Sequence, residues 1–352
     1  MIVSQLAGSG IVAVDFTAYG WITALKVAVV LGIIPAGALI LGYVFLLKMM
    51  SFMQSRLGPM EAGPYGTLQL VADGVKFIQK EDIFPDRADR RVFALAPVVV
   101  LASTFLLYIA IPAGPRLIIQ DLDTGIFYAL AVSSLSVLGI LMAGWASANK
   151  YSLMGGLRAA GQLIAYELPL VLAVVGVVIQ AGSLSLQDIV LAQANGSIFG
   201  MGALGSPFII TQFVGFVIFL IAIQAELTQT PFDMPVAESE LVAGYMVEYT
   251  GFRFLFFFMA EFGTAFAFSA IGATLFLGGW WVPGMPTSGV MADVLGPLVL
   301  GGKIMLVAFL IFWIRFTYPR LREDQLQTFA WKYLIPVSLL NILATGVLKV
   351  VF

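Results

Sequence analysis

Eight long apolar runs, separated by polar stretches, constrain this chain more than any single motif does. Each run has roughly the 20 residues that a helix needs to cross a hydrocarbon layer about 30 Å thick. The chain has 352 residues, of which only 11% are charged, whereas a soluble domain has about 25%. The sequence therefore predicts an all-α integral membrane protein, with residues 1–352 forming a single transmembrane domain. The predicted spans are residues 19–47, 92–113, 124–145, 159–180, 207–225, 254–280, 295–314 and 331–352.

The basic residues predict how these spans are oriented. Lys and Arg gather in the loops after the first, third, fifth and seventh spans, and the alternate loops hold only Arg116. Because an excess of Lys and Arg marks the cytoplasmic side, we expect both termini outside the cytoplasm. The first cytoplasmic loop then covers about 48–91 and an acidic cytoplasmic loop about 226–253. Residues 183–206 and 283–294 are predicted to be loops, and residues 1–14 lack the basic segment of a cleaved signal peptide.

The first cytoplasmic loop contains a predicted amphipathic helix at 64–80. Leu68, Val71, Val75 and Ile78 fall on one side at helical spacing, whereas Asp73 and Lys76 fall on another. This pattern is typical of a helix that lies in the membrane interface. A surface helix that only holds the cytoplasmic rim together is the alternative.

Carboxylates are concentrated around residues 226–261. Acidic side chains at membrane depth are costly, so they usually face a partner or a water-filled cavity. Taken together they favour a hydrated acidic channel for protons; structural pairing of each one, or a docking surface for a basic soluble partner, is the alternative. The acidic residues are Glu167 in the fourth span, Glu226, Asp233, Glu238, Glu240, Glu248 and Glu261.

The chain has no Cys and no His. Thiolate-held iron–sulfur clusters, ordinary haem ligation and most zinc or copper sites need one or the other. Catalysis by Ser–His or Cys–His pairs is excluded as well. We therefore expect no metal, haem or iron–sulfur cluster in this chain and no catalytic residue of its own, and nothing in the sequence indicates nucleic-acid binding.

Several stretches resemble one family, the quinone-site membrane subunit of respiratory complex I, also called the H subunit of NADH-quinone oxidoreductase. The first is MQSRLGP at 53–59 with Gly63-Pro64, followed by LQLVADGVKFIQKEDIFP at 68–85. ANKYSLMGGLRAAGQLIAYELPL at 148–170 resembles the third loop and the start of the fourth helix of that family. TPFDMPVAESELVAGYMVEYTGFRF at 230–254 is the most distinctive match.

The resemblance implies eight transmembrane helices and a subunit of a multi-subunit, proton-translocating NADH:quinone oxidoreductase that is inactive alone. Quinone is then the substrate. The implied partners are soluble iron–sulfur subunits at the cytoplasmic face, small membrane subunits, antiporter-like pumping subunits and membrane lipids. The implied location is a bacterial or archaeal cytoplasmic membrane. By resemblance, Arg56, Asp73, Lys76, Phe232 and Asp233 contact the quinone, and Glu167, Glu226, Glu238, Glu240, Glu248 and Glu261 form the proton path.

The chain departs from the family pattern at charged positions. Leu46 and Leu47 replace a Glu-Arg pair, Gln229 replaces an Arg and Met246 replaces a His. These departures leave open an equivalent subunit of a ferredoxin-, deazaflavin- or hydrogenase-linked complex. The acidic residues are also compatible with a proton- or ion-coupled secondary transporter, and the apolar runs with a membrane anchor for a soluble enzyme.

Overall fold

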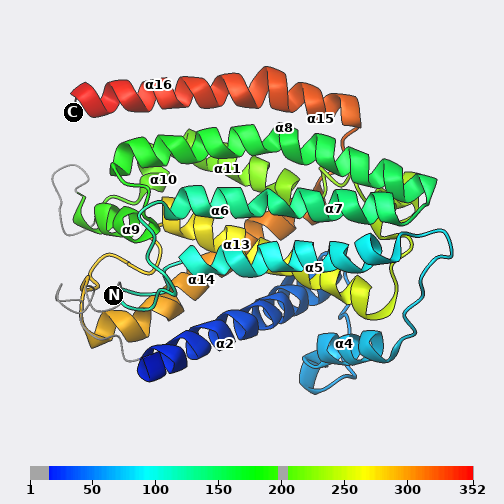
Figure 1. The fold of residues 1–352 in the computed structure, drawn as a ribbon. Coiled ribbons are helices and arrows are strands. Elements are labelled where there is room, and N and C mark those ends of the chain that lie inside the picture. Colours follow the sequence, from blue (N-terminus) through cyan, green and yellow to red (C-terminus); the bar gives the residue numbers. More distant parts are fainter. Residues whose placement is uncertain (1–15, 197–204, 352) are drawn as a thin grey trace, which may run out of the picture.

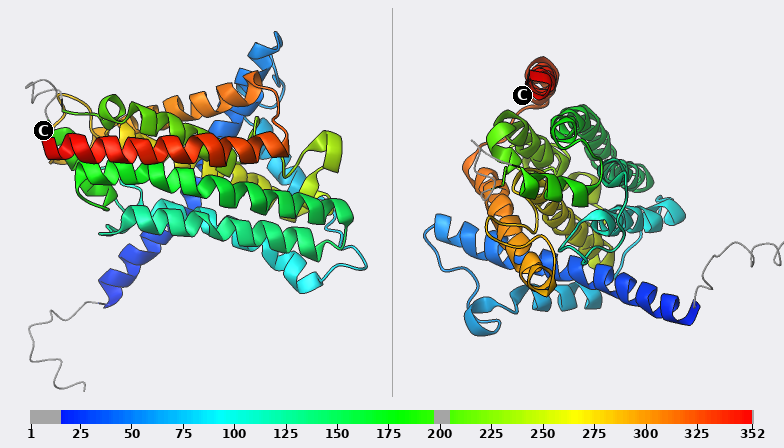
Figure 2. Two further views of the ribbon diagram at one scale, coloured as in Figure 1. Left: turned by 90° about the horizontal axis from the view of Figure 1, so that it is seen from above. Right: turned by 90° about the vertical axis from the view of Figure 1, so that its left-hand side faces the viewer.

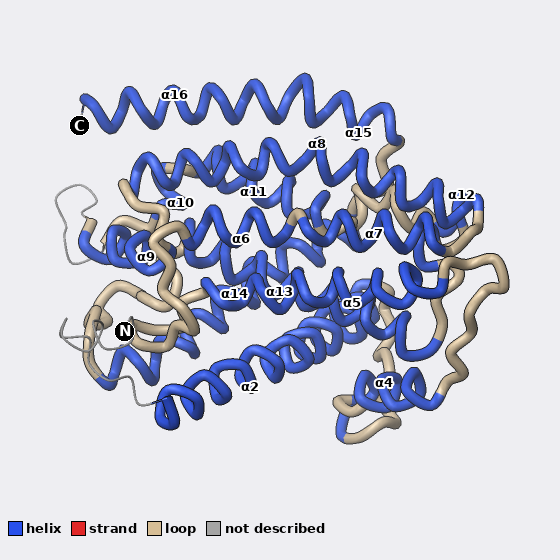
Figure 3. The backbone as a smooth tube through the Cα atoms, viewed as in Figure 1, coloured by secondary structure: helices blue, strands red, loops and turns tan. Residues whose placement is uncertain are grey.

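A computed structural model describes residues 16–196 and 205–351, and every regular element in these ranges is helical (Figures 1 and 3). The expectation about a signal peptide concerns residues that lie outside these ranges. Within the described residues, seven helices are long and apolar enough to cross a membrane, which confirms an integral membrane protein. They are Thr23–Met53, Arg90–Ala110, Gly125–Ala146, Lys150–Ala181, Gly251–Phe276, Val290–Thr317 and Glu323–Val350.

Several of these long helices are built from shorter elements with a local change of helical winding. Prolines lie inside five of them, and neighbouring helices in a membrane bundle tolerate such interruptions. The elements are α2 (Phe16–Leu41), η1 (Gly42–Met49), α3 (Met50–Met53), α5 (Arg90–Leu107), η3 (Tyr108–Ala110), α6 (Gly125–Ser133), α7 (Leu135–Ala146), α8 (Lys150–Ala181), α13 (Gly251–Phe276), α14 (Val290–Thr317), α15 (Glu323–Phe329), η6 (Ala330–Leu334) and α16 (Ile335–Val351). The segments η1 and η6 are π-helical.

The fifth predicted span is interrupted. It consists of α10 (Phe208–Thr211) and α11 (Phe213–Glu226), with Gln212 between them. Helix α11 alone has 14 residues, which gives a length of about 21 Å. The Gln212 side chain donates to Thr345 Oγ1 at 2.7 Å and accepts from Asn341 at 3.0 Å. The interruption is therefore fastened to α16 by buried side-chain hydrogen bonds.

Two predicted loops contain helix. Residues 183–206 include α9 (Leu186–Asn195), which begins where the Ser185 hydroxyl accepts from the backbone N–H of Asp188. Helix α14 begins at Val290, inside the predicted loop 283–294. Both predictions were wrong: α9 is a short helix capped by Ser185, so it needs no long apolar run, and α14 begins before the apolar run that it continues.

The bundle has two distinct ends. Helix α13 runs through its interior, α16 lies outermost against α8, and α2 crosses obliquely on the opposite side (Figures 1 and 2). One end carries α4 (Gln69–Gln79) and the acidic loop, and we call it the acidic end. The opposite end carries α9, the start of α2 and the finish of α16 (Figure 1). This end-to-end polarity separates the charged loops from the rest of the bundle.

Helix α4 (Gln69–Gln79), preceded by the short η2 (Pro64–Gly66), confirms a helix in the first loop. Its Phe77 ring lies 5.4 Å from the ring of Phe254 at the start of α13. Its opposite side is an exposed apolar row in which Leu68, Val71, Val75 and Ile78 are 46–62% exposed. The helix thus turns apolar side chains both toward the bundle and away from it.

The acidic loop packs against α8 without side chains between the two backbones. A Cβ at Gly155 of α8 would lie 2.7 Å from the backbone N of Tyr245 and 2.8 Å from the Cα of Gly244. Both are backbone atoms, which cannot rotate away as a side-chain tip can. Gly155 therefore allows the acidic loop to approach the bundle this closely.

We predict that Gly155→Ala destabilises the protein by about 1–3 kcal/mol, the usual cost of overpacking. The Gly161→Ala variant of the same helix is the matched control, because its Cβ would meet only the end of the Gln327 side chain at 3.8 Å. Thermal unfolding in mild detergent measures both. Equal unfolding midpoints for the two variants would contradict the close approach.

Candidate functional site

The acidic loop, which in the structure covers residues 227–250 between α11 and α13, folds into the end of the bundle instead of projecting from it. It contains the short helices α12 (Glu238–Leu241) and η5 (Gly244–Met246). Its apolar and aromatic side chains Phe232, Met234, Leu241, Tyr245 and Tyr249 are all buried. The loop therefore forms part of the packed interior.

Aromatic contacts hold both halves of this loop. The Phe232 ring lies 5.1 Å from that of Tyr166 on α8. The Tyr249 ring stacks on Phe93 of α5 at 4.0 Å. Such pairs add about 0.5–1.5 kcal/mol beyond the area that they bury. The rings thus fix the loop on α8 and α5.

Glu240 joins three elements at the surface of the acidic end. Its carboxylate accepts from Arg158 of α8 at 2.6 Å and from Arg320 of the segment after α14. Arg158 also contacts Glu323 of α15 at 3.5 Å. The hydrogen bond from Arg158, with the positive charge of Arg320, holds the pKa of Glu240 below its ordinary value. Because Glu240 is exposed, each of these pairs is worth little alone, but together they connect α12 to two other elements.

Glu261, in the interior of α13, has two partners from distant parts of the chain. Its Oε1 accepts from Gln229 Nε2 at 2.6 Å and lies 3.3 Å from Arg315 Nη1 of α14. The charge of Glu261 is therefore compensated by one cation and one amide, as a carboxylate at this depth requires.

Asp233 lies beside this pair and has a strongly altered acidity. Burial raises the pKa of Asp233 from 3.8 to about 6, and the negative charge of Glu261 also raises it. The positive charges of Arg315 and Arg320 and a backbone hydrogen bond from Ala237 act in the opposite direction. Asp233 can therefore gain or lose a proton near neutral pH.

Glu226 ends α11 and is half-buried. Among the described residues, its Oε2 atom has no hydrogen-bond partner, and it lies within the electrostatic reach of Glu167 on α8. The side-chain oxygens of Gln162, Gln224 and Gln229 are likewise buried and unpartnered in the part of the chain described.

These unpartnered oxygens are all hydrogen-bond acceptors, so they cannot form hydrogen bonds with one another. The amide groups of these glutamines already donate elsewhere: Gln162 to Ala225 O and Gln224 to Thr230 O, both at 2.7 Å, and Gln229 to Glu261. Water or a protonated carboxyl group is a suitable donor to such an oxygen.

The first loop meets the acidic loop at their far ends. Arg253 donates to Asp82 at 2.6 Å, and the Ile83 N–H donates to Thr250 Oγ1 at 3.2 Å. Residues of the first loop and the acidic loop are therefore in contact with each other, although they are about 170 positions apart in sequence.

A protein-family model described as NADH dehydrogenase matches residues 25–346. An Anoxybacillus flavithermus protein, named as the H subunit of NADH-quinone oxidoreductase, is 47% identical over 306 residues, which cover 87% of each chain. The protein of that name from Brevibacillus brevis is 47% identical over 315 residues, covering 88% of this chain and 90% of the relative. The Bacillus thuringiensis subsp. konkukian protein is 46% identical over 306 residues, 87% of each chain. The chain belongs to the family of NADH-quinone oxidoreductase H subunits.

The structure brings only some of the predicted proton-path residues together. Glu261 lies next to Asp233, and Glu226 lies within the electrostatic reach of Glu167. Glu238 and Glu240 are exposed at the surface. Glu248 accepts from Asn149 Nδ2 at 2.6 Å, and the same Asn149 caps the start of α8. The role of each in a proton path stays a prediction.

The predicted quinone contacts occupy two places. Phe232 and Asp233 lie in the acidic loop, inside the bundle end. Arg56 is exposed after α3 and donates to Gln54 at 2.8 Å, whereas Asp73 and Lys76 pair on α4 at 3.4 Å. Their contact with a quinone also stays a prediction for this member of the H-subunit family.

Sequence reasoning missed the partners of the acidic residues. Arg158, Arg315 and Arg320 served only to orient the spans, yet they contact Glu240 and Glu261. Gln162 and Gln224 were passed over, although an amide inside an apolar run was a usable signal. Within residues 16–196 and 205–351, no group of three or more His, Cys, Asp or Glu side chains is arranged to hold a metal ion.

We predict that Asp233→Asn changes how stability depends on pH. Between about pH 4 and about pH 6 the native state binds more protons than the unfolded chain, so the free energy of unfolding falls as pH rises. The variant lacks this fall. Its stability relative to the wild type should therefore increase by up to about 3 kcal/mol from low to neutral pH.

Thermal unfolding across this pH range tests the prediction. The Asp324→Asn variant controls for the loss of a formal charge, because that side chain is 68% exposed. Parallel curves for the wild type and Asp233→Asn would show that Asp233 does not titrate in this way.

Proposed function

We propose that this chain is the membrane subunit of a proton-translocating NADH-quinone oxidoreductase that lines part of the quinone chamber and begins the acidic proton path. The observation that carries the proposal is the set of half-buried carboxyl groups Asp233, Glu261 and Glu226 at one end of a membrane bundle. The shared name of its relatives supports the reaction. A secondary transporter gains no support from these comparisons.

The chamber wall is formed by the first loop and the acidic loop. Their connection through Arg253–Asp82 and Thr250 supports a common border. Phe232 supplies an apolar surface and Asp233 a carboxyl group beside it, which suits a flat, mostly apolar headgroup with two carbonyl oxygens. Arg56, Asp73 and Lys76 approach from the first loop as hydrogen-bonding groups.

Reduction of a quinone to a quinol consumes two electrons and two protons. The chain has no Cys or His to hold an iron–sulfur cluster or a haem, and in this proposal the electrons come from soluble iron–sulfur subunits at the cytoplasmic face. Asp233, with a pKa of about 6, can supply a proton to the region and then carries a negative charge. That negative charge repels Glu261 and attracts Arg315, so it changes the electrostatic interaction between these two side chains.

The proton path continues inward from this cluster. Gln229 connects Glu261 to the end of α11, where Glu226 faces Glu167 of α8. The unpartnered oxygens of Gln162, Gln224 and Gln229 supply acceptors along this route. Antiporter-like subunits beside the bundle, together with small membrane subunits, complete the pump. Glu238, Glu240 and Glu248 lie at the mouth of the path.

The membrane topology follows the same proposal. Helices α10 and α11 together make the eighth crossing, since residues 208–226 extend about 28 Å as one interrupted helix. The backbone N–H of Gln212 donates to Phe208 O and its carbonyl accepts from Phe216, so hydrogen bonding continues through the interruption. The acidic end faces the cytoplasm and both termini lie outside. The exposed apolar row of α4 rests in the membrane interface.

We predict that Glu226→Gln and Glu167→Gln lower the number of protons pumped per quinone reduced. Each change removes an ionisable group but keeps the side-chain size, so the complex should still assemble. Proton uptake and quinone reduction are measured together in inverted membrane vesicles. The Glu323→Gln variant is the control, because this carboxylate is 53% exposed at the rim.

Normal pumping in both interior variants, with assembly intact, would remove Glu226 and Glu167 from the path. A loss of quinone reduction equal to the loss of pumping would instead indicate damage to the chamber and would also contradict the proposed role.

We predict that Arg56→Ala lowers kcat/KM for quinone reduction by about tenfold, the effect of losing one charge-assisted hydrogen bond. Arg87→Ala, an exposed arginine of the same loop, is the control. Steady-state kinetics with a soluble quinone measures both variants. Equal kinetic constants for Arg56→Ala and the wild type would exclude Arg56 from the chamber.

A further inference from the structure

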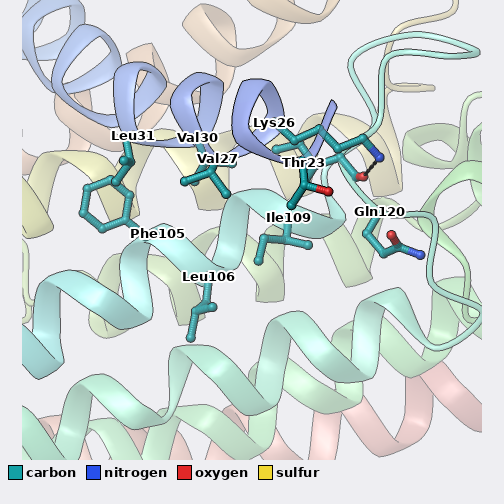
Figure 4. Close-up of a pocket in the computed structure, with 10 residues that line it drawn as sticks. Thr23, Lys26, Val27, Val30, Leu31, Phe105, Leu106, Ile109 and Gln120 are labelled. Atoms are coloured by element: carbon teal, nitrogen blue, oxygen red, sulfur yellow. Dashed lines mark hydrogen bonds between the residues drawn. The ribbon is translucent and has the colours of Figure 1, made fainter. Parts of the chain in front are cut away.

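Two apolar recesses flank the first helix at the end of the bundle opposite to the acidic end. Lys26 of α2 borders both recesses and donates to the backbone oxygen of Ile119 (Figure 4). One recess, of about 430 Å³, lies between α2 and α5, where Phe105 and Ile109 line it. The other, of about 500 Å³, lies between α2, α13 and α14, and we call it the α2–α14 groove. The start of α2 is thus attached to a bundle that it does not fully cover.

The α2–α14 groove combines apolar walls with positive charge alone. Its walls include Ile33, Phe266 and Leu300, and its charged lining residues are Lys26 and Arg116. Neighbouring side chains of α2 point outward, with Leu25 65% and Val29 50% exposed. The groove therefore opens toward the hydrocarbon surroundings of a membrane helix.

The two cations keep donors for a ligand. Lys26 uses one of its three donors on Ile119. Arg116 is 80% exposed, and its nearest acid, Asp293, lies 4.0 Å from Nε. Asp293 also accepts from the Arg116 backbone N–H at 3.2 Å, so it fixes the backbone of Arg116 more than it occupies the guanidinium. A negative group between Lys26 and Arg116 would meet several free N–H donors.

We propose that the α2–α14 groove binds one anionic phospholipid. An acyl chain lies along the apolar walls, and the phosphate accepts hydrogen bonds from Lys26 and Arg116. A lipid with a cationic headgroup would bring a third positive charge to this rim, which is unfavourable. The bound lipid acts as a packing element that holds the start of α2 against α13 and α14.

This site has a consequence at the acidic end because α2, η1 and α3 form one continuous helix, Thr23–Met53. Packing at its start therefore affects the position of its finish, just before Arg56. The lipid site is independent of the proposed quinone contacts, since its residues lie at the other end of the bundle.

Photo-crosslinking on the assembled complex in membranes tests the proposal. Two probes carry the same photoactivatable acyl chain, one on phosphatidylglycerol and the other on phosphatidylcholine. Mass spectrometry then measures labelling of peptides from α2 and α14. We expect phosphatidylglycerol to label them well above phosphatidylcholine. Equal labelling by both probes, or no labelling by either, would overturn the proposal.

A matched pair of glycine variants tests the apolar part. Gly301 lines the groove and Gly302 does not, and a Cβ at either position would meet no atom within 4 Å. Gly301→Leu should therefore fill the groove and abolish labelling by phosphatidylglycerol without disturbing the fold. Gly302→Leu should leave it unchanged. Labelling that survives in Gly301→Leu would place the lipid elsewhere.

Charge variants test the headgroup. Lys26→Gln and Arg116→Gln should each weaken the preference for phosphatidylglycerol about fivefold. Lys349→Gln is the control, since Lys349 of α16 also donates to a backbone oxygen, that of Ile179, but lies outside the groove. An unchanged preference in both groove variants would show that their charges do not select the lipid.

Discussion

A hydrocarbon layer supplies no hydrogen bonds, and this constraint governs the whole bundle. Each buried polar group must find a partner within the protein or mark a place where water or a proton belongs. The first outcome is seen at Gln212, whose amide joins the interrupted α10–α11 segment to α16. The second is suggested by Glu226, whose buried oxygen has no partner in the described residues. A polar group with partners inside the protein, such as Gln212, is therefore interpreted as structural. A buried polar atom without one, such as Oε2 of Glu226, is a candidate for proton transport.

The acidic loop holds two carboxyl groups whose pKa values are shifted in opposite directions. At Glu240, two arginines hold the pKa of the carboxyl group below its ordinary value and keep it charged. At Asp233, burial and the nearby Glu261 raise the pKa to about 6. Environments that push the acidities of neighbouring groups apart are typical of sites that transfer protons. In this loop the surface carboxylate anchors the backbone, and the buried one is left able to titrate.

The two ends of the bundle use positive charge differently. At the acidic end, Arg158, Arg315 and Arg320 neutralise carboxylates of the same chain. At the opposite end, Lys26 and Arg116 face an apolar groove that holds no acidic lining residue among those described. The same residue types therefore serve internal compensation at one end and, in our proposal, recognition of a lipid at the other. Burial and the nearest acidic neighbours make the difference.

The sequence by itself determined the membrane class, the approximate helices and the family, because long apolar runs and the motif at 230–254 need no knowledge of neighbours. It also located the acidic residues, but it gave no partners for them. Glu240 meets Arg158 across 82 positions and Glu261 meets Arg315 across 54. Helical periodicity fixes which side of a helix a residue occupies, but only tertiary packing decides which other helix it faces. For that reason Glu248 is hydrogen-bonded to Asn149 at the start of α8, whereas the half-buried Glu226 has, among the described residues, no partner at Oε2. No pattern within the chain distinguishes the two.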